Sequence, residues 1–250
     1  MSDSPQEAIK FDGVSKSFGD REVLKDITFA VPAGTAFVLL GRSGSGKSVT
    51  LKMICGLLKA DAGTVVVNGE DVTHFDSSQL MNARKKMGFL FQSAALFDSL
   101  TVGENVAFPL RRHTQKPEGE IRDQSADILE RVGLGKEYES MPADLSGGMR
   151  KRAGLARALA MEPSILLIDE PSAGLDPITS TEIDELLMEI KTTRHATLVV
   201  VTHNIPSARR IGDQLAFLDQ GKLLMQGTVE EAEKSEHQLV RDFMKSQQAG

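Results

Sequence analysis

The segment Gly41–Ser48, Gly41-Arg42-Ser43-Gly44-Ser45-Gly46-Lys47-Ser48, constrains the fold more than any other part of this 250-residue chain. It fits the pattern G-x-x-x-x-G-K-[ST], follows the apolar run Ala36–Leu40, and precedes a stretch that we expect to be helical. Glycines let such a loop curl so that backbone N–H groups point inward, and the following helix directs its positive end to the same point. The pattern therefore predicts a strand, a phosphate-binding loop and a helix in succession. The alternative is a glycine turn before a helix.

Individual residues of this loop have separate expected roles. Lys47 should reach the outer phosphates of the ligand, and Ser48 should place its hydroxyl on Mg²⁺. Val49 supplies no second hydroxyl for the inner phosphate, so only its backbone N–H is available there.

Short apolar runs indicate the fold class. Ile165–Ile168 and Leu198–Val201, like Ala36–Leu40, are rich in aliphatic residues and predict buried parallel strands. Helices are expected at Gly46–Leu58, Ser125–Val132, Gly147–Met161 and Ser180–Lys191. Short segments near Ile9–Val14, Val23–Phe29 and Gly63–Val67 predict antiparallel strands, and Asp98–Asp144 should be mainly helical, with an exposed loop or helix start at 113–124. The alternation of strands and helices predicts an α/β fold.

Polar side chains follow the predicted strands. Asp169 and Glu170 end one strand, where Asp169 would hold Mg²⁺ and Glu170 would act as a general base on water. His203 follows another strand and would contact the γ-phosphate, and Gln92 follows the strand Gly88–Phe91 and could touch metal and water. Taken alone, each has a plainer interpretation: a polar turn for the acidic pair, a structural histidine and a surface glutamine.

Composition excludes several other classes. The net charge of −6 and the 5% aromatic content argue against a protein held on nucleic acid by charge or by base stacking. The single cysteine, Cys55, excludes an internal disulfide and a cysteine-built zinc site, and we expect it to be a small core residue. No apolar run approaches the roughly 20 residues that span a bilayer.

The segment Leu145-Ser146-Gly147-Gly148-Met149 completes a set of motifs. Together with Gly41–Ser48, Gln92, the Asp169-Glu170 pair, Asp176 and His203, it resembles the ABC-type ATPases over nearly the whole chain and in the family's order. The resemblance implies a P-loop NTPase of ABC type. Its mainly parallel central sheet would carry an N-terminal antiparallel β subdomain and a helical subdomain. It places the ATP-binding domain at 7–226, the helical subdomain at about 93–160, and a tail, 227–250, that would dock on the dimer mate or on a partner.

The same resemblance implies a head-to-tail dimer. Each ATP would lie between Gly41–Ser48 of one subunit and Ser146, Gly147 and Gly148 of the other, with Asp176 coupling the sites. Phe18 matches the aromatic position that stacks on adenine, although a core phenylalanine is the alternative.

Finer details favour one branch. LSGGM followed by basic residues, and the tail motif Leu239–Phe243, are similar to the ATPase of Mla/Mce-type phospholipid transporters. That resemblance implies a peripheral subunit at the cytoplasmic face of the inner membrane. Its partners would be an integral-membrane permease, an Mce-domain protein and a small STAS-domain protein, with no nucleic acid. By family position, Ser93–Leu100 and the Leu110–Arg112 edge would form the groove for the permease. The alternatives are a polar-solute importer or exporter and a non-transport regulatory ABC ATPase.

Two expectations concern surface features. The basic clusters Arg84–Lys86, Arg111-Arg112 and Arg150–Arg152 should form solvated faces or helix ends. Apart from its suggested docking role, the tail could be a solvated and partly frayed helix.

Overall fold

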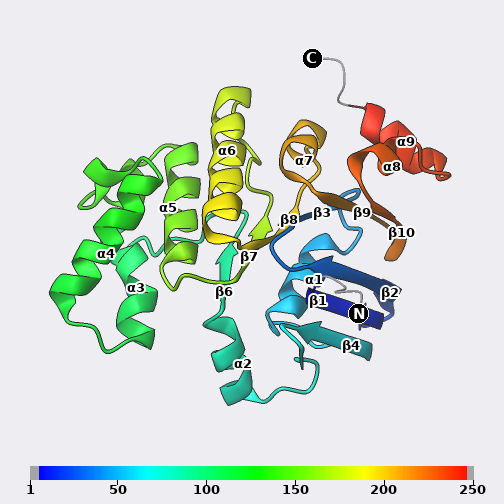
Figure 1. Cartoon of the computed structure of the whole chain (residues 1–250), viewed down its shortest axis with the longest axis horizontal. Helices are drawn as coiled ribbons and strands as arrows, with labels where there is room; N and C mark the ends of the chain where they lie inside the picture. Colours follow the sequence, from blue (N-terminus) through cyan, green and yellow to red (C-terminus); the bar gives the residue numbers. More distant parts are fainter. Residues whose placement is uncertain (1–5, 247–250) are drawn as a thin grey trace.

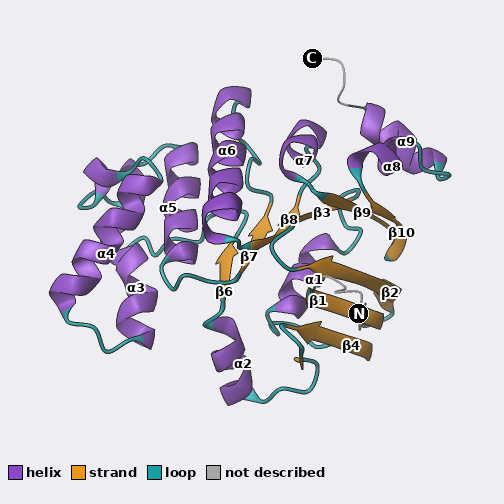
Figure 2. Cartoon of the chain, in the orientation of Figure 1, coloured by secondary structure: helices purple, strands orange, loops and turns teal. Residues whose placement is uncertain are grey.

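A computed structural model describes residues 6–246 as two β-sheets and the helices around them (Figures 1 and 2). The four-stranded sheet has the order β2-β1-β4-β5 and the six-stranded sheet the order β10-β9-β3-β8-β7-β6. The strands are β1 (Glu7–Phe18), β2 (Arg21–Pro32), β3 (Ala36–Leu40), β4 (Ala62–Val67), β5 (Glu70–Asp71), β6 (Met87–Leu90), β7 (Ile165–Asp169), β8 (Thr197–Val201), β9 (Gln214–Asp219) and β10 (Lys222–Gly227). The predicted α/β class and the N-terminal antiparallel sheet are confirmed.

The six-stranded sheet is parallel from β9 to β6, and β10 pairs antiparallel with β9 at one edge. Every residue of β3, β7 and β8 is buried, because both faces of the sheet are covered. Alternate side chains of β3 enter different cores: Val38 and Leu40 pack on one face, Phe37 and Leu39 on the other. This two-sided burial explains why the strands read as continuous apolar runs.

Helices cover the faces of this sheet unequally (Figure 1). They are α1 (Lys47–Ile54), α2 (Ser77–Arg84), α3 (Val102–His113), α4 (Glu118–Arg131), α5 (Gly147–Leu159), α6 (Pro177–Arg194), α7 (Ile205–Ile211), α8 (Val229–Glu233) and α9 (Gln238–Lys245), with 3₁₀ turns at Gly135–Glu137 and Pro142–Asp144. Residues of α3 to α7 and of α9 share one core, and α1 joins the four-stranded sheet in the other.

Several helix boundaries differ from the expected ones. The first helix stops at Ile54 rather than at residue 58, because Gly56 adopts a left-handed φ of 64°. The helix expected from Ser125 begins at Glu118. The helix expected at 180–191 runs from Pro177 to Arg194, because the Asp176 side chain caps its start.

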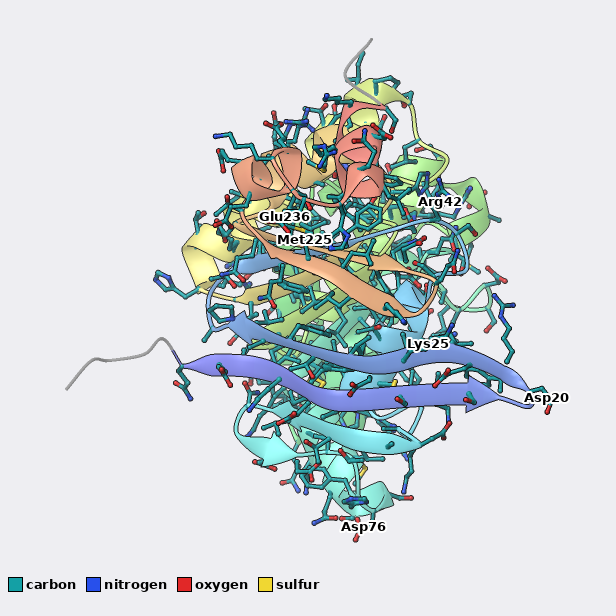
Figure 3. The ribbon with its side chains drawn as sticks, turned by 90° about the vertical axis from the view of Figure 1, so that its right-hand side faces the viewer. Asp20, Lys25, Arg42, Asp76, Met225 and Glu236 are labelled. Atoms are coloured by element: carbon teal, nitrogen blue, oxygen red, sulfur yellow. The ribbon has the colours of Figure 1, made fainter. Side chains whose placement is uncertain are left out.

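The two sheets meet along β2 and β10. The backbone N–H of Lys25 donates to the carbonyl of Gly221 at 2.8 Å, and the Gln226 side chain donates to the carbonyl of Ala30 at 2.7 Å. Figure 3 labels Lys25 and Met225 and shows β10 beside β2. Strand β1 ends at Phe18, which lies near the loop that follows β3.

The described part of the tail packs on its own chain. Val240 and Met244 of α9 are fully buried, and the ring of Phe243 lies edge-on to that of Phe217 with centroids 4.9 Å apart. The alternative of a solvated, frayed helix is therefore wrong for α9. The last four residues of the predicted tail, 247–250, lie outside the described residues. Between residues 6 and 246, no helix has the length and apolar character needed to cross a membrane.

Candidate nucleotide site

Four parallel strands bring the predicted site residues to one edge of the sheet. Strand β3 ends before Gly41, β6 before Gln92, β7 before Glu170 and β8 before His203. Ligands of open α/β sheets bind at the carboxyl ends of the strands. A cavity of about 680 Å³ lies there.

Most of the predicted ATP-binding and catalytic residues line this cavity. They are Phe18, Gly41, Arg42, Ser43, Gly44, Gly46, Lys47, Ser48, Val49, Gln92, Glu170 and His203. Ser45 and Asp169 are buried and do not line this cavity, and Ser45 Oγ has no hydrogen-bond partner. Arg21, Val23 and Phe243 also line the cavity, and sequence patterns did not identify them.

The loop Gly41–Ser48 depends on its glycines. A Cβ on Gly41 would lie 2.1 Å from the carbonyl oxygen of Leu218, and Gly41 has a φ of 150°. A Cβ on Gly46 would lie 2.5 Å from a methyl group of Leu24, at a φ of 109°. The loop therefore follows a path closed to other residues, and Gly46 sits directly at the N-terminus of α1, where a helix favours anions.

Lys47 lies inside this loop. Its ammonium donates to the carbonyls of Gly41 at 2.8 Å and Arg42 at 3.1 Å, and only 7% of the residue is exposed. Burial lowers the pKa of Lys47, and the nearby carboxylates of Glu170 and Asp169 oppose that shift. The lysine thus holds the loop through two carbonyls, and its ammonium has the charge and the reach to bind a phosphate oxygen there.

Ser48 and Asp169 form a pair of oxygen atoms beneath the loop. The Ser48 hydroxyl donates to Asp169 Oδ1 at 3.1 Å. Burial raises the pKa of Asp169, and the hydrogen bond from Ser48 opposes the rise. No cluster of three or more His, Cys, Asp or Glu side chains within residues 6–246 could hold a metal ion by itself. A hydroxyl beside one carboxylate suits Mg²⁺, which takes its other oxygen ligands from substrate phosphates and water.

Glu170 is held at several points. Its φ of 49° lies in the left-handed region, and its N–H donates to the carbonyl of Val201 at 2.8 Å. Its carboxylate contacts His203 Nδ1 at 2.9 Å and accepts from the Thr202 hydroxyl at 3.3 Å. The glutamate and histidine chosen from separate strand ends are therefore neighbours, with the glutamate side chain only 12% exposed.

Lys151 corrects the expectation that the cluster Arg150–Arg152 is solvated. It is 5% exposed and donates to the carbonyls of Gln92 and Glu170. Burial lowers the pKa of Lys151, whereas the carboxylates of Glu170 and Asp169 raise it.

Arg84, in another of the basic clusters expected to be solvated, is hydrogen-bonded within the chain. Its guanidinium donates to the carbonyls of Cys55 and Gly56. Cys55 is buried as expected.

The signature residues Ser146, Gly147 and Gly148 do not appear among the described residues that line this cavity. Ser146 caps α5, its hydroxyl accepting from the N–H of Met149 at 3.2 Å. Gly148 packs so closely on Thr179 that a Cβ would lie 2.5 Å from its methyl group, and Thr179 donates its hydroxyl to Asp176 at 2.6 Å. That bond lowers the pKa of Asp176. The signature and Asp176 thus form one surface, separate from the chain's own phosphate loop.

Phe18 is not a core residue. It is 48% exposed, lines the cavity, and lies under the Lys16 ammonium, 5.5 Å from the ring centroid. The structure removes the alternative of a buried phenylalanine, and the stacking role remains a prediction.

The family profile described as "ABC transporter" matches residues 24–173 of this chain. The chain belongs to the ABC transporter family. It is the ATP-binding, ATP-hydrolysing subunit of such a transporter.

Two relatives and one solved structure of this family are similar to the chain over most of its length. The chain is 44% identical over 243 residues to the "Probable ribonucleotide transport ATP-binding protein mkl" of Mycobacterium tuberculosis, covering 97% of this chain and 68% of that protein. It is 37% identical over 244 residues to the "Intermembrane phospholipid transport system ATP-binding protein MlaF" of Escherichia coli K12, covering 98% and 91%. The cassette MJ0796, solved as a dimer after hydrolysis with ADP and Pi, superposes with a TM-score of 0.82 at 32% identity, covering 88% of this chain and 98% of that one.

Proposed function

We propose that this ABC subunit hydrolyses ATP to drive phospholipid movement between membranes, in a transporter of the Mla type. The observation that carries the cargo assignment is the extent of the match to MlaF, which includes 98% of this chain and 91% of that protein. The LSGGM signature and the tail motif Leu239–Phe243 favour the same branch. The subunit would work at the cytoplasmic face of the inner membrane, on an integral-membrane permease, with Mce-domain and STAS-domain partners.

Glu170 is the base in this proposal. Its carboxylate accepts a proton from water as the water oxygen bonds to the γ-phosphorus and ADP leaves. The hydrogen bonds from Thr202 and the 2.9 Å contact to His203 fix its direction. Lys47 would exchange its loop carbonyls for outer phosphate oxygens, and Phe18 would stack on adenine.

Mg²⁺ fits the same site. Ser48 and Asp169 would hold it, with Gln92 at the cavity edge as a further oxygen ligand. When bound, the ion neutralises charge on the β- and γ-phosphates.

A second copy of the chain would complete each site. Ser146, Gly147 and Gly148 begin a 13-residue helix whose N-terminus suits a phosphate, yet they lie outside the chain's own cavity. In a head-to-tail pair they would cover the partner's ATP, and Asp176, on the same surface, would couple the sites. The MJ0796 cassettes, which were solved as dimers, support the pairing of two copies of this chain.

A groove near α3 is the proposed permease site. It has a volume of about 650 Å³, and its apolar wall includes Met81, Phe97 and Phe108, which are 43–48% exposed. We call it the docking groove. Phe108→Asp should abolish copurification of the permease from detergent-solubilised membranes. Leu57→Asp alters an equally exposed apolar residue outside the groove and should preserve it. Loss with both variants, or with neither, would contradict this docking site.

The cargo is tested by purification and reconstitution. Affinity purification should recover a permease and an Mce-domain protein, and the complex in proteoliposomes should move labelled phospholipid between vesicle populations on addition of ATP. The 44% identity to mkl favours a second candidate, transport of a ribonucleotide. ATP-dependent uptake of labelled ribonucleotide without lipid movement would replace the phospholipid proposal and leave the ATPase assignment intact.

A further inference from the structure

Lys151 occupies an unusual position for a lysine. It lies in the first half of α5, and its ammonium donates to the carbonyl of Gln92 at 2.5 Å and to that of Glu170 at 2.9 Å. Lysine is rarely this deeply buried unless it is paired, and here its partners are backbone carbonyls. One charged group thus joins the segments that follow β6 and β7.

The Glu170 end of this bridge lies at a strained point of the backbone. Glutamate seldom adopts a φ near 49°, and such a conformation persists only where the surroundings hold it. The carbonyl of Val201 accepts from the N–H of Glu170, and the carbonyl of Glu170 accepts from Lys151 at 2.9 Å and from the N–H of Ala173 at 3.3 Å. The direction of the Glu170 side chain follows from that backbone, so the ammonium contributes to the aim of the carboxylate.

The Gln92 end belongs to a second strained segment. Ala94 and Ala95 have φ values of 62° and 48°, and Arg157 of α5 donates to their carbonyls at 2.9 and 2.8 Å. Arg157 also lies over the ring of Phe97 in the docking groove, 5.7 Å from its centroid. Helix α5 therefore holds the loop after Gln92 at two points. Arg157 binds it beside the docking groove, and Lys151 binds it beside Glu170.

We propose that Lys151 is a positioning residue that couples the loop after Gln92 to the backbone of Glu170, so that displacement of this loop at the docking groove changes the aim of the carboxylate. The inference rests on the proposed role of Glu170 as the base. It assigns a specific function to a side chain that does not line the nucleotide cavity.

Removal of the ammonium is the direct test. Lys151→Met keeps most of the stem and removes the ammonium from both carbonyls, leaving that of Glu170 with the N–H of Ala173 at 3.3 Å. We therefore expect kcat to fall about 10- to 100-fold, the scale of losing a charge-assisted hydrogen bond that positions a reacting group. Binding of a fluorescent ATP analogue should stay within about threefold of wild type, because the phosphate loop is unchanged. Lys151→Arg should recover much of kcat. Arg152→Met, on the same helix, removes a cation paired with Glu182 and should leave kcat unchanged.

A merely structural role would give different results. It would lower kcat, nucleotide affinity and melting temperature together, with no recovery in Lys151→Arg, and that pattern overturns the inference. So does a kcat within twofold of wild type in Lys151→Met or, should that variant not fold, in Lys151→Gln. Hydrogen exchange of the free protein gives an independent readout: amides of residues 93–95 and of Glu170 and Ser172 should exchange faster in Lys151→Met and not in Arg152→Met.

The test also separates this inference from the role of Glu170. If Lys151 acts by aiming that carboxylate, Lys151→Met should lower turnover further by less than twofold in a Glu170→Gln background. Full additivity overturns the positioning role. Wild-type turnover in Glu170→Gln alone would instead refute the base assignment.

Discussion

Replacement of Glu170 by glutamine is the most informative single change in this site. Glutamine has the same shape and keeps one oxygen to accept from His203. Its amide would face the Thr202 hydroxyl, which can turn to accept a hydrogen bond instead of donating one. We therefore expect the free energy of unfolding to change by less than about 1 kcal/mol. The variant removes the proposed proton acceptor and changes little else.

The size of the kinetic effect follows from the burial of this carboxylate. General-base catalysis contributes about 10²- to 10⁴-fold, which corresponds to about 2.7–5.4 kcal/mol in the activation free energy. The Glu170 side chain is only 12% exposed, so bulk water has little access to take over its role. A loss toward the upper part of that range, about 10³-fold or more in kcat, is therefore expected.

The assay compares phosphate release with nucleotide binding. Glu170→Gln should release phosphate at the reduced rate while binding a fluorescent ATP analogue within about threefold of wild type. Bound but unhydrolysed ATP should hold the closed dimer, seen as a shift to dimer size in gel filtration with ATP. Glu182→Gln, a neutralisation on the surface of α6, serves as the control and should behave as wild type. Undiminished kcat in Glu170→Gln would refute the reasoning.

Two further changes test the phosphate loop and the tail. In Lys47→Ala, ATP should no longer raise the melting temperature, whereas wild-type protein gains about 2.7 kcal/mol at 100 times Kd, and an equal gain in both would refute the role of Lys47 as a phosphate ligand. Met244→Ala should lower the urea-derived free energy of unfolding by about 2–5 kcal/mol, because this side chain of α9 is fully buried in the core. Met81→Ala, at a 48% exposed position, should change it by less than about 0.5 kcal/mol, and equal effects would show that α9 does not pack as described.

The sequence predicted the centre of the fold well for a physical reason. Strands β3, β7 and β8 are buried on both faces, so each appears as an uninterrupted apolar run. The loop Gly41–Ser48 can be recognised from its local sequence pattern. Its glycines Gly41 and Gly46 stand where a Cβ would clash with neighbouring atoms. The ends of β3, β6, β7 and β8 lie along one edge of the sheet, and this brings Glu170 and His203 together.

Other parts depend on contacts that no local pattern encodes. A lysine between two arginines is typical of a solvated face, and only the packing of α5 against the ends of β6 and β7 reveals the burial of Lys151. Strands β9 and β10 were not predicted, although β9 contains the apolar stretch Leu215–Leu218. Phe243 could not be assigned to the cavity, because its place depends on how the tail folds back over β9.

The left-handed backbone of Glu170 sets the stability of the chain against the proposed role of this side chain. Glycine or asparagine would adopt a φ of 49° with less strain, so a chain selected for stability alone would replace the glutamate. Glu170→Gly should relieve local strain of about 1 kcal/mol and abolish turnover. Stability and the proposed activity thus make opposite demands on this position.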